Sequence, residues 1–193
     1  MNLAGMRGPI IRAQDCPPQP WKNGLGTTRE IAVYPSDARS EDFLWRVSIA
    51  EVDSAAPFSC FPGIDRHIAL LDGAGFTMAL DDGRIHALTT PFAPFAFAGE
   101  AEVAVTLADG PTSDFNLMVR RAQASGEVEV WQEPGAHPLD PATVLIYAVR
   151  GEIETVDGTL HGGDAWLAHA PAAGHVTLQD GALAFAISIR HTG

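Results

Sequence analysis

The sequence predicts an all-β protein made of two small β-barrels. Its apolar segments are short, and several of them alternate between apolar and polar residues, the period of strands that bury one face. Many of these segments end at Asp-Gly or at another pair containing Gly, as strands do in hairpins. The second half of the chain repeats the order of the first, and no long stretch presents an apolar helical face. This pattern is typical of a sandwich or barrel.

The first half contains a series of expected strands, each with turn residues behind it. In the first of them Trp45 lies on one face, and Arg46 and Ser48 lie on the other. The run that follows Ile64 ends at Asp72-Gly73, a hairpin signal. The expected strands cover residues 43–50, 67–71, 76–80, 102–107 and 115–120.

The second half repeats this series. The segment that begins at Ile68 overlays the segment that begins at Leu145, as strand, Gly turn, strand, Asp-Gly and short strand. Further strands are expected at residues 144–149, 152–156, 175–178 and 183–190. We therefore expect an N-terminal barrel with a ligand pocket (1–121), a linker rich in Gly, Pro and Glu (122–140), and a degenerate second barrel (141–193) completed by strands from the first half.

Composition narrows the function classes. The chain has 193 residues, enough to bury a core, and its formal net charge is −12, with 12 basic against 24 acidic residues. A nucleic-acid partner is not expected, because such partners need clustered Lys and Arg. The two cysteines lack CxxC spacing, which fits a reducing compartment. No signal peptide and no apolar run of membrane-spanning length is visible, so we expect a cytoplasmic protein without a membrane partner.

Local motifs for a metal, a nucleophile or a nucleotide are missing from the sequence. None of the seven histidines is spaced as His-x-His or as a helical pair. There is no Gly-x-Ser-x-Gly elbow and no Gly-rich phosphate fingerprint. We therefore expect no metal, no cofactor and no catalytic residue.

The segment 17–31 is the most distinctive part of the chain. It carries three prolines and two glycines among an aromatic residue, an amide, hydroxyls and charges. Pro restricts φ and Gly frees it, so this run is a shaped loop rather than a helix. Lys22, Asn23 and Thr28 supply groups that can hold an anion or a polar metabolite.

Three arginines lie in strand-like settings: Arg29, Arg46 and Arg66. An arginine inside a barrel needs a partner, because an unpaired buried charge is costly. That partner is a protein carboxylate or a bound anion, and a guanidinium suits a carboxylate ligand well.

Six blocks in order between residues 18 and 120 resemble the HutD/Ves family. They are Trp21-Lys22-Asn23-Gly24-x-Gly26-x-Thr28-Arg29-Glu30-Ile31, Trp45-Arg46-x-Ser48-Ile49-Ala50, Phe58-Ser59-x-Phe61-Pro62-Gly63-x-Asp65-Arg66, Leu71-Asp72-Gly73-x-Gly75, Pro94-Phe95-Ala96-Phe97-x-Gly99 and Asp114-Phe115-Asn116-Leu117-Met118. The resemblance implies a bicupin fold of two jelly-roll barrels without the His-x-His metal motif. It also implies a link to histidine utilisation in bacteria, as a modulator that senses a pathway intermediate.

Together the residues and the resemblance lead us to expect a metal-free protein that binds a carboxylate such as urocanate or formylglutamate. Arginines would hold the carboxylate, the loop would cover it, aromatic rings would form walls, and Glu30 or Asp114 would orient an arginine. Strand alternation places Trp45 opposite Arg46, which conflicts with a shared pocket. The expected ligand-binding residues are Lys22, Asn23, Thr28, Arg29, Glu30, Trp45, Arg46, Ser48, Phe61, Arg66, Phe97, Asp114 and Asn116.

The sequence is also compatible with two other functions. One is a metal-independent enzyme acting on a small organic acid, with Glu30 or Lys22 as acid or base. The other is an interaction protein whose second barrel docks a regulator or a second copy of the chain, which would make a homodimer.

Overall fold

The computed structural model describes residues 10–38, 42–55, 57–168 and 174–193, and it confirms the all-β class. The described residues form eighteen strands and one short 3-10 turn, η1 (Ala13–Asp15). All strand pairings are antiparallel, and the strands belong to four sheets.

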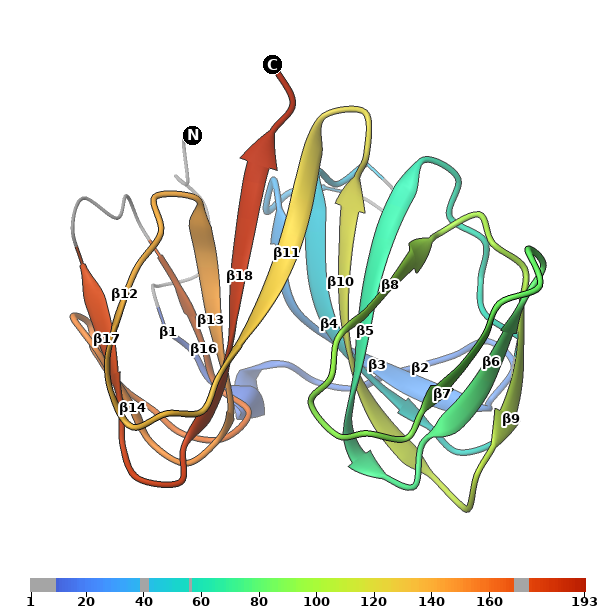
Figure 1. The fold of residues 1–193 in the computed structure, drawn as a ribbon, viewed down its shortest axis with the longest axis horizontal. Helices are drawn as coiled ribbons and strands as arrows, with labels where there is room; N and C mark the ends of the chain where they lie inside the picture. The colour runs from blue at the N-terminus through green and yellow to red at the C-terminus, as the bar shows by residue number, and fades with distance from the viewer. Residues whose placement is uncertain (1–9, 39–41, 56, 169–173) are drawn as a thin grey trace.

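Two of the sheets make the first lobe, drawn on the right in Figure 1. The larger has six strands in the order β2 (Gln19–Pro20), β3 (Gly26–Tyr34), β4 (Trp45–Val52), β10 (Thr112–Arg120), β5 (Ile64–Gly73) and β8 (Phe95–Ala98). The smaller has three strands in the order β7 (Ile85–Leu88), β6 (Phe76–Leu80) and β9 (Val103–Leu107).

The other two sheets make the second lobe, on the left in Figure 1. A five-stranded sheet has the order β1 (Ile10–Ile11), β16 (Ala165–Leu167), β13 (Thr143–Arg150), β18 (Leu183–His191) and β11 (Ala124–Trp131). A four-stranded sheet has the order β12 (Gly135–Pro138), β17 (His175–Leu178), β14 (Ile153–Thr155) and β15 (Gly158–Leu160).

Three hydrophobic cores join these sheets into layers. The largest lies between the six- and five-stranded sheets and contains Trp45, Phe115 and Phe185, so the two lobes share one core. A second core lies between the six- and three-stranded sheets, and a third between the five- and four-stranded sheets. The six-stranded sheet is therefore covered on one face by the second lobe, while its other face lines the inside of the first lobe.

The second lobe repeats the strand order of the first, as the overlay of the two halves of the sequence predicts. The run β8-β5-β10-β4 in the first lobe has the same order as β16-β13-β18-β11 in the second. Likewise β7-β6-β9 corresponds to β15-β14-β17. The four sheets remain open in the part of the chain that the structure describes, because none of them pairs its two outer strands.

Residues 122–140, expected to form a linker, instead contain two strands. Strand β11 pairs with β18 along its whole length, and β12 pairs with β17. The strand β11 alternates Val128 and Val130 with Glu127 and Glu129, and its valines pack against the shared core. At the other end of the chain, β1 pairs with β16, so the N-terminal part of the described chain also contributes to the second lobe.

Within the described residues, no helix is long and apolar enough to cross a membrane.

Phe115 tests how much the shared core contributes to stability. Its ring is fully buried between the lobes, 5.0 Å from the Phe185 ring and 5.7 Å from the Tyr147 ring. We expect Phe115→Ala to lower the unfolding free energy by about 3–5 kcal/mol, because it removes buried surface and leaves a cavity. Urea denaturation measures this, with Ile85→Ala as the control because Ile85 is 75% exposed. Equal effects of the two substitutions would contradict a shared core.

Candidate ligand-binding site

The inner face of the six-stranded sheet carries a cavity of about 570 Å³. Its floor comes from strands β3, β4, β10 and β5, which point alternate side chains into the first lobe. Two loops complete it, one before β3 and one before β5. It is lined by Pro20, Trp21, Lys22, Asn23, Thr28, Arg46, Ser48, Ala50, Val52, Pro57, Phe58, Ser59, Phe61, Arg66, Ile68, Asp114, Asn116 and Met118.

The loop over the cavity is the hairpin between β2 and β3. The Trp21 amide donates to the Gly26 carbonyl, and the Trp21 indole Nε1 donates to Thr28 Oγ1 at 2.8 Å. A side chain at residue 26 would collide with the Glu51 carbonyl and crowd the Trp21 indole, so Gly26 lets the indole lie against the backbone. The Asn23 side chain accepts from the Leu25 amide and closes the turn. The loop that the sequence singled out therefore has a defined shape at the cavity.

Arg66 is the central cation of this site. Its guanidinium lies over three phenylalanine rings, 5.0 Å from the centroids of Phe58 and Phe97 and 5.5 Å from that of Phe61. Such contacts hold a cation in place without supplying a negative charge. Its Nη2 donates to Asn116 Oδ1 at 3.1 Å, and its Nε has no hydrogen-bond acceptor among the described residues.

Arg66 is only 6% exposed, and no carboxylate forms an ion pair with it among the described residues. Burial, together with the positive charge of Arg46, lowers the pKa of Arg66 from 12.5 to about 10. The guanidinium is still charged at neutral pH. A buried charge without a counter-ion is costly, so an anion entering this cavity would relieve that cost.

Arg46 lies in the same cross-strand row as Arg66, with Met118 between them on β10. Its Nε is 2.9 Å from Glu30 Oε2, a contact with the distance of an ion pair but not the geometry of a hydrogen bond. One of the two arginines therefore has an acidic partner on the neighbouring strand, and the other does not. The exposed Lys22 adds a third positive charge at the cavity.

Asp114 is the buried acid of the cavity and is only 1% exposed. Its Oδ2 accepts from Thr112 Oγ1 at 3.1 Å, while its Oδ1 has no partner among the described residues. Burial, with a smaller contribution from the nearby Glu51, raises the pKa of Asp114 from 3.8 to about 7. The sequence led us to expect that Glu30 or Asp114 orients an arginine. Glu30 pairs with Arg46, and Asp114 forms no ion pair with an arginine among the described residues.

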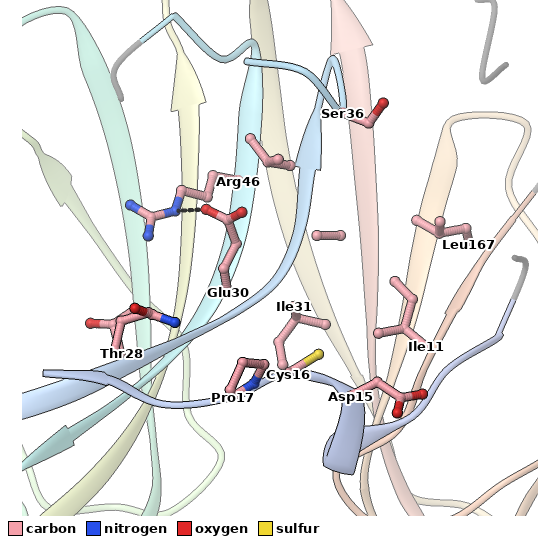
Figure 2. Close-up of a pocket in the computed structure, with 13 residues that line it drawn as sticks. Ile11, Asp15, Cys16, Pro17, Thr28, Glu30, Ile31, Ser36, Arg46 and Leu167 are labelled. Atoms are coloured by element: carbon pink, nitrogen blue, oxygen red, sulfur yellow. Dashed lines mark ion pairs between the residues drawn. The ribbon is translucent and has the colours of Figure 1, made fainter. Parts of the chain in front are cut away.

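A second cavity, of about 440 Å³, lies beside the first where the two lobes meet. It shares Thr28 and Arg46 with the first cavity. Figure 2 shows Glu30 facing Arg46 on one side of this space and Ile11 and Leu167 on the other. The Arg46–Glu30 pair therefore lies at the border between the two cavities.

The structure brings nine of the thirteen expected site residues to the first cavity. These are Lys22, Asn23, Thr28, Arg46, Ser48, Phe61, Arg66, Asp114 and Asn116.

The other four lie elsewhere. Trp45 points from β4 to the opposite face and is fully buried in the core between the lobes, as strand alternation requires. Arg29 points the same way on β3, and its Nη1 donates to the Cys16 carbonyl at 3.2 Å. Glu30 lines the second cavity, and Phe97 packs beneath Arg66 without lining the first cavity. Trp45 is thus not a wall of the pocket, which corrects the expectation.

Sequence reasoning missed Trp21, Phe58 and Ser59 as lining residues. All three lie inside the sequence blocks that carry the family resemblance, so a signal was present. Ala50 and Met118, which also belong to these blocks, and Val52 and Ile68, which do not, line the cavity too, but their apolar side chains are those of ordinary strand residues.

Three or more His, Cys, Asp or Glu side chains do not gather anywhere in the described ranges in a way that could hold a metal ion.

The HutD family model matches residues 13–185 of this chain. The chain belongs to the HutD family. It is 36% identical to an uncharacterised 21.2 kDa protein in the hutC 3′ region of Pseudomonas putida, over 75% of each chain. It is also 45% identical to Protein Ves of Cronobacter sakazakii, over 57% of this chain and 59% of the Ves protein.

A solved structure of HutD from Pseudomonas fluorescens SBW25, from a formate condition, matches this chain with a TM-score of 0.82. The two are 30% identical, and the match covers 95% of this chain and 98% of the other. A cupin barrel protein from Leptotrichia buccalis matches with a TM-score of 0.58 at 8% identity, over 99% of this chain and 100% of that one. The second likeness shows a cupin-like fold and nothing of function.

The raised pKa of Asp114 makes stability depend on pH. Below about pH 4 the Asp114 carboxyl is protonated in both the folded and the unfolded chain. As the pH rises further, the unfolded chain loses this proton first, because burial makes ionisation unfavourable in the folded chain. Stability relative to Asp114→Asn should therefore fall as pH rises from about 4 to about 8, by on the order of 4 kcal/mol.

Urea unfolding of both proteins across this pH range measures the difference. Asp109→Asn is the control, because Asp109 is exposed and its substitution should give no such slope. A difference between wild type and Asp114→Asn that stays constant with pH, or grows as pH rises, would rule out a buried Asp114 with a raised pKa.

Proposed function

We propose that this protein binds a small carboxylate without a metal and acts as a modulator of histidine utilisation that senses a pathway intermediate, such as urocanate or formylglutamate. The observation that carries the proposal is Arg66: a buried guanidinium that lines a cavity and has no acidic partner among the described residues. A ligand carboxylate would supply the missing negative charge and can accept two parallel hydrogen bonds from a guanidinium.

The rest of the cavity supports a small organic acid rather than an inorganic anion. Phe58, Phe61, Val52 and Ile68 line it beside the polar groups, a mixture typical of metabolite sites. Lys22 and Asn23, on the β2–β3 hairpin, would close over a ligand held at Arg66. In this arrangement Arg46, already paired with Glu30, adds positive potential rather than the main contact.

The link to histidine utilisation rests on the relatives. One of them lies in the hutC 3′ region of Pseudomonas putida, and the HutD structure from Pseudomonas fluorescens carries the family's name. Formate, named in the description of that structure, is the smallest carboxylate, which agrees in chemistry with the proposed ligand.

We also propose that the two lobes are the two halves of a bicupin. The repeated strand order and the likeness to a cupin barrel protein support this. In that arrangement the first lobe holds the ligand and the second stabilises it through the shared core.

A metal-independent enzyme is the second candidate, and the raised pKa of Asp114 favours it. A carboxyl whose pKa lies near 7 in a cavity suits general acid–base catalysis. NMR of EDTA-treated protein with urocanate and formylglutamate would decide between the two. Conversion of either compound by wild type and not by Asp114→Asn supports the enzyme, and unchanged spectra support a binding protein.

Arg66→Met tests the proposed site. Methionine retains the unbranched apolar stem of the side chain but removes the charged guanidinium, so we expect a folded protein. In a thermal-shift screen of histidine-pathway carboxylates, wild type should be stabilised by at least one compound, because a ligand that binds the folded state raises its stability. Arg66→Met should lose that shift, with affinity reduced about 10-fold or more.

Arg84→Met is the matched control, because Arg84 has an exposed side chain on the turn before β7 and lies outside the cavity. It should keep the wild-type shift. A folded Arg66→Met protein with the full ligand-induced shift would show that the carboxylate binds elsewhere.

A further inference from the structure

The first cavity contains a second buried group with an unpartnered atom among the described residues. This group is a carboxyl, whereas Arg66 is a cation. Asp114 is 1% exposed, lines the cavity, and accepts only the Thr112 hydroxyl among the described residues. Its other carboxyl oxygen accepts no hydrogen bond from the part of the chain that the structure describes. Buried polar atoms are nearly always hydrogen-bonded, so an unpartnered acceptor in a cavity points to a donor supplied by a ligand.

Asp114 is not the counter-ion of Arg66. The pKa of Arg66 is lowered by burial and by Arg46, and the pKa of Asp114 is raised by burial and by Glu51. A close pair would move both pKa values in the opposite direction. Both groups line the first cavity, but they do not form an ion pair with each other.

Strand geometry indicates how the two groups are ordered along the sheet. The Arg66 side chain runs along the sheet to Asn116, where Nη2 donates to Oδ1 at 3.1 Å. Asp114 lies two residues from Asn116 on the same face of β10, roughly 7 Å along the strand. Asn116 Nδ2 in turn donates to the Asp114 carbonyl at 3.4 Å, which fixes the amide between the two ends. Contact with both groups therefore needs a metabolite larger than formate, with a second polar group apart from its carboxylate.

We propose that the ligand is a carboxylate that also carries an N–H donor, with its carboxylate held by Arg66 and its N–H donating to Asp114. This inference rests on the proposed function, because it needs the carboxylate to bind at Arg66. It adds a specificity-determining residue and narrows the ligand class.

Carboxylates that also carry an N–H donor are a narrower ligand class than small carboxylates in general. A nitrogen heteroaromatic carboxylate such as urocanate fits, since its ring N–H lies several bonds from the carboxylate. The apolar side chains of Ile68 and Val52 would lie beside the ring. A compound that placed a second carboxylate at Asp114 would be repelled by it, because two like charges in a buried site oppose each other.

Pyrrole and furan carboxylates test this directly. The two rings have nearly the same shape, but pyrrole presents an N–H donor where furan presents an oxygen. We would measure the affinity of wild type for the acetates and the acrylates of both rings by calorimetry at about pH 8, where Asp114 is mostly ionised. For the acetates, the acrylates or both, the pyrrole compound should bind about 10- to 100-fold more tightly than the furan compound with the same acid group.

Asp114→Leu removes the acceptor and should bring the ratio of pyrrole to furan affinity to about one. Asp114→Asn retains a neutral acceptor oxygen and should give an intermediate ratio, which keeps the test open if the leucine variant does not fold. The ratio is the readout because general damage to the fold lowers both affinities alike. Asp109→Asn, at an exposed residue outside the cavity, should keep the wild-type ratio.

The outcomes separate the two proposals. If all four compounds bind wild type with equal affinity for the two rings, or if the preference survives in both Asp114 variants, the inference is wrong while carboxylate binding at Arg66 stands. If none of the four binds, or if Arg66→Met leaves their affinities unchanged, the proposed function itself fails.

Discussion

The site depends on one unbalanced charge, the buried guanidinium of Arg66. Three phenylalanine rings and one amide hold it, and none of these groups is negative. Aromatic rings offset only part of the desolvation cost of a cation, which agrees with the lowered pKa of Arg66. A buried cation with this cost and no counter-ion among the described residues is the reason why we propose a small anion as the ligand. The neighbouring Arg46 differs, because it has Glu30 as an acidic partner.

The architecture allows this because one sheet serves two purposes. The face of the six-stranded sheet that carries Trp45 and Phe115 packs on the second lobe and stabilises the fold. The opposite face is free to carry Arg66 and Asp114, residues that would be costly in a hydrophobic core. The second lobe therefore supports, through the shared core, the sheet that carries the first cavity.

Much of the fold could be predicted from the sequence, because alternation and Asp-Gly turns are local signals. The segment 122–140 shows where such signals conflict. Its Gly, Pro and Glu content suggests a linker, yet Val128 and Val130 alternate with glutamates in the pattern of a strand with one buried face. That pattern indicates a strand only if a neighbouring strand is available, and the partner β18 lies about sixty residues further along the chain.

The site could be predicted in its residues more than in its geometry. Alternation alone separates Arg46 from Trp45, and the structure places the tryptophan in the core accordingly. Alternation could not show that Arg46 has an acidic partner and that Arg66 has none among the described residues, because both facts depend on contacts between neighbouring strands of the folded sheet. The sequence could not predict the unpartnered oxygen of Asp114 either, because it too depends on contacts that exist only in the folded sheet.

A crystal structure of this protein with a bound histidine-pathway carboxylate tests the account most directly. We expect the carboxylate within hydrogen-bond distance of the Arg66 guanidinium, beneath the hairpin that carries Trp21. A carboxylate bound elsewhere, or an Arg66 that pairs with a protein acid when the site is filled, would contradict the account.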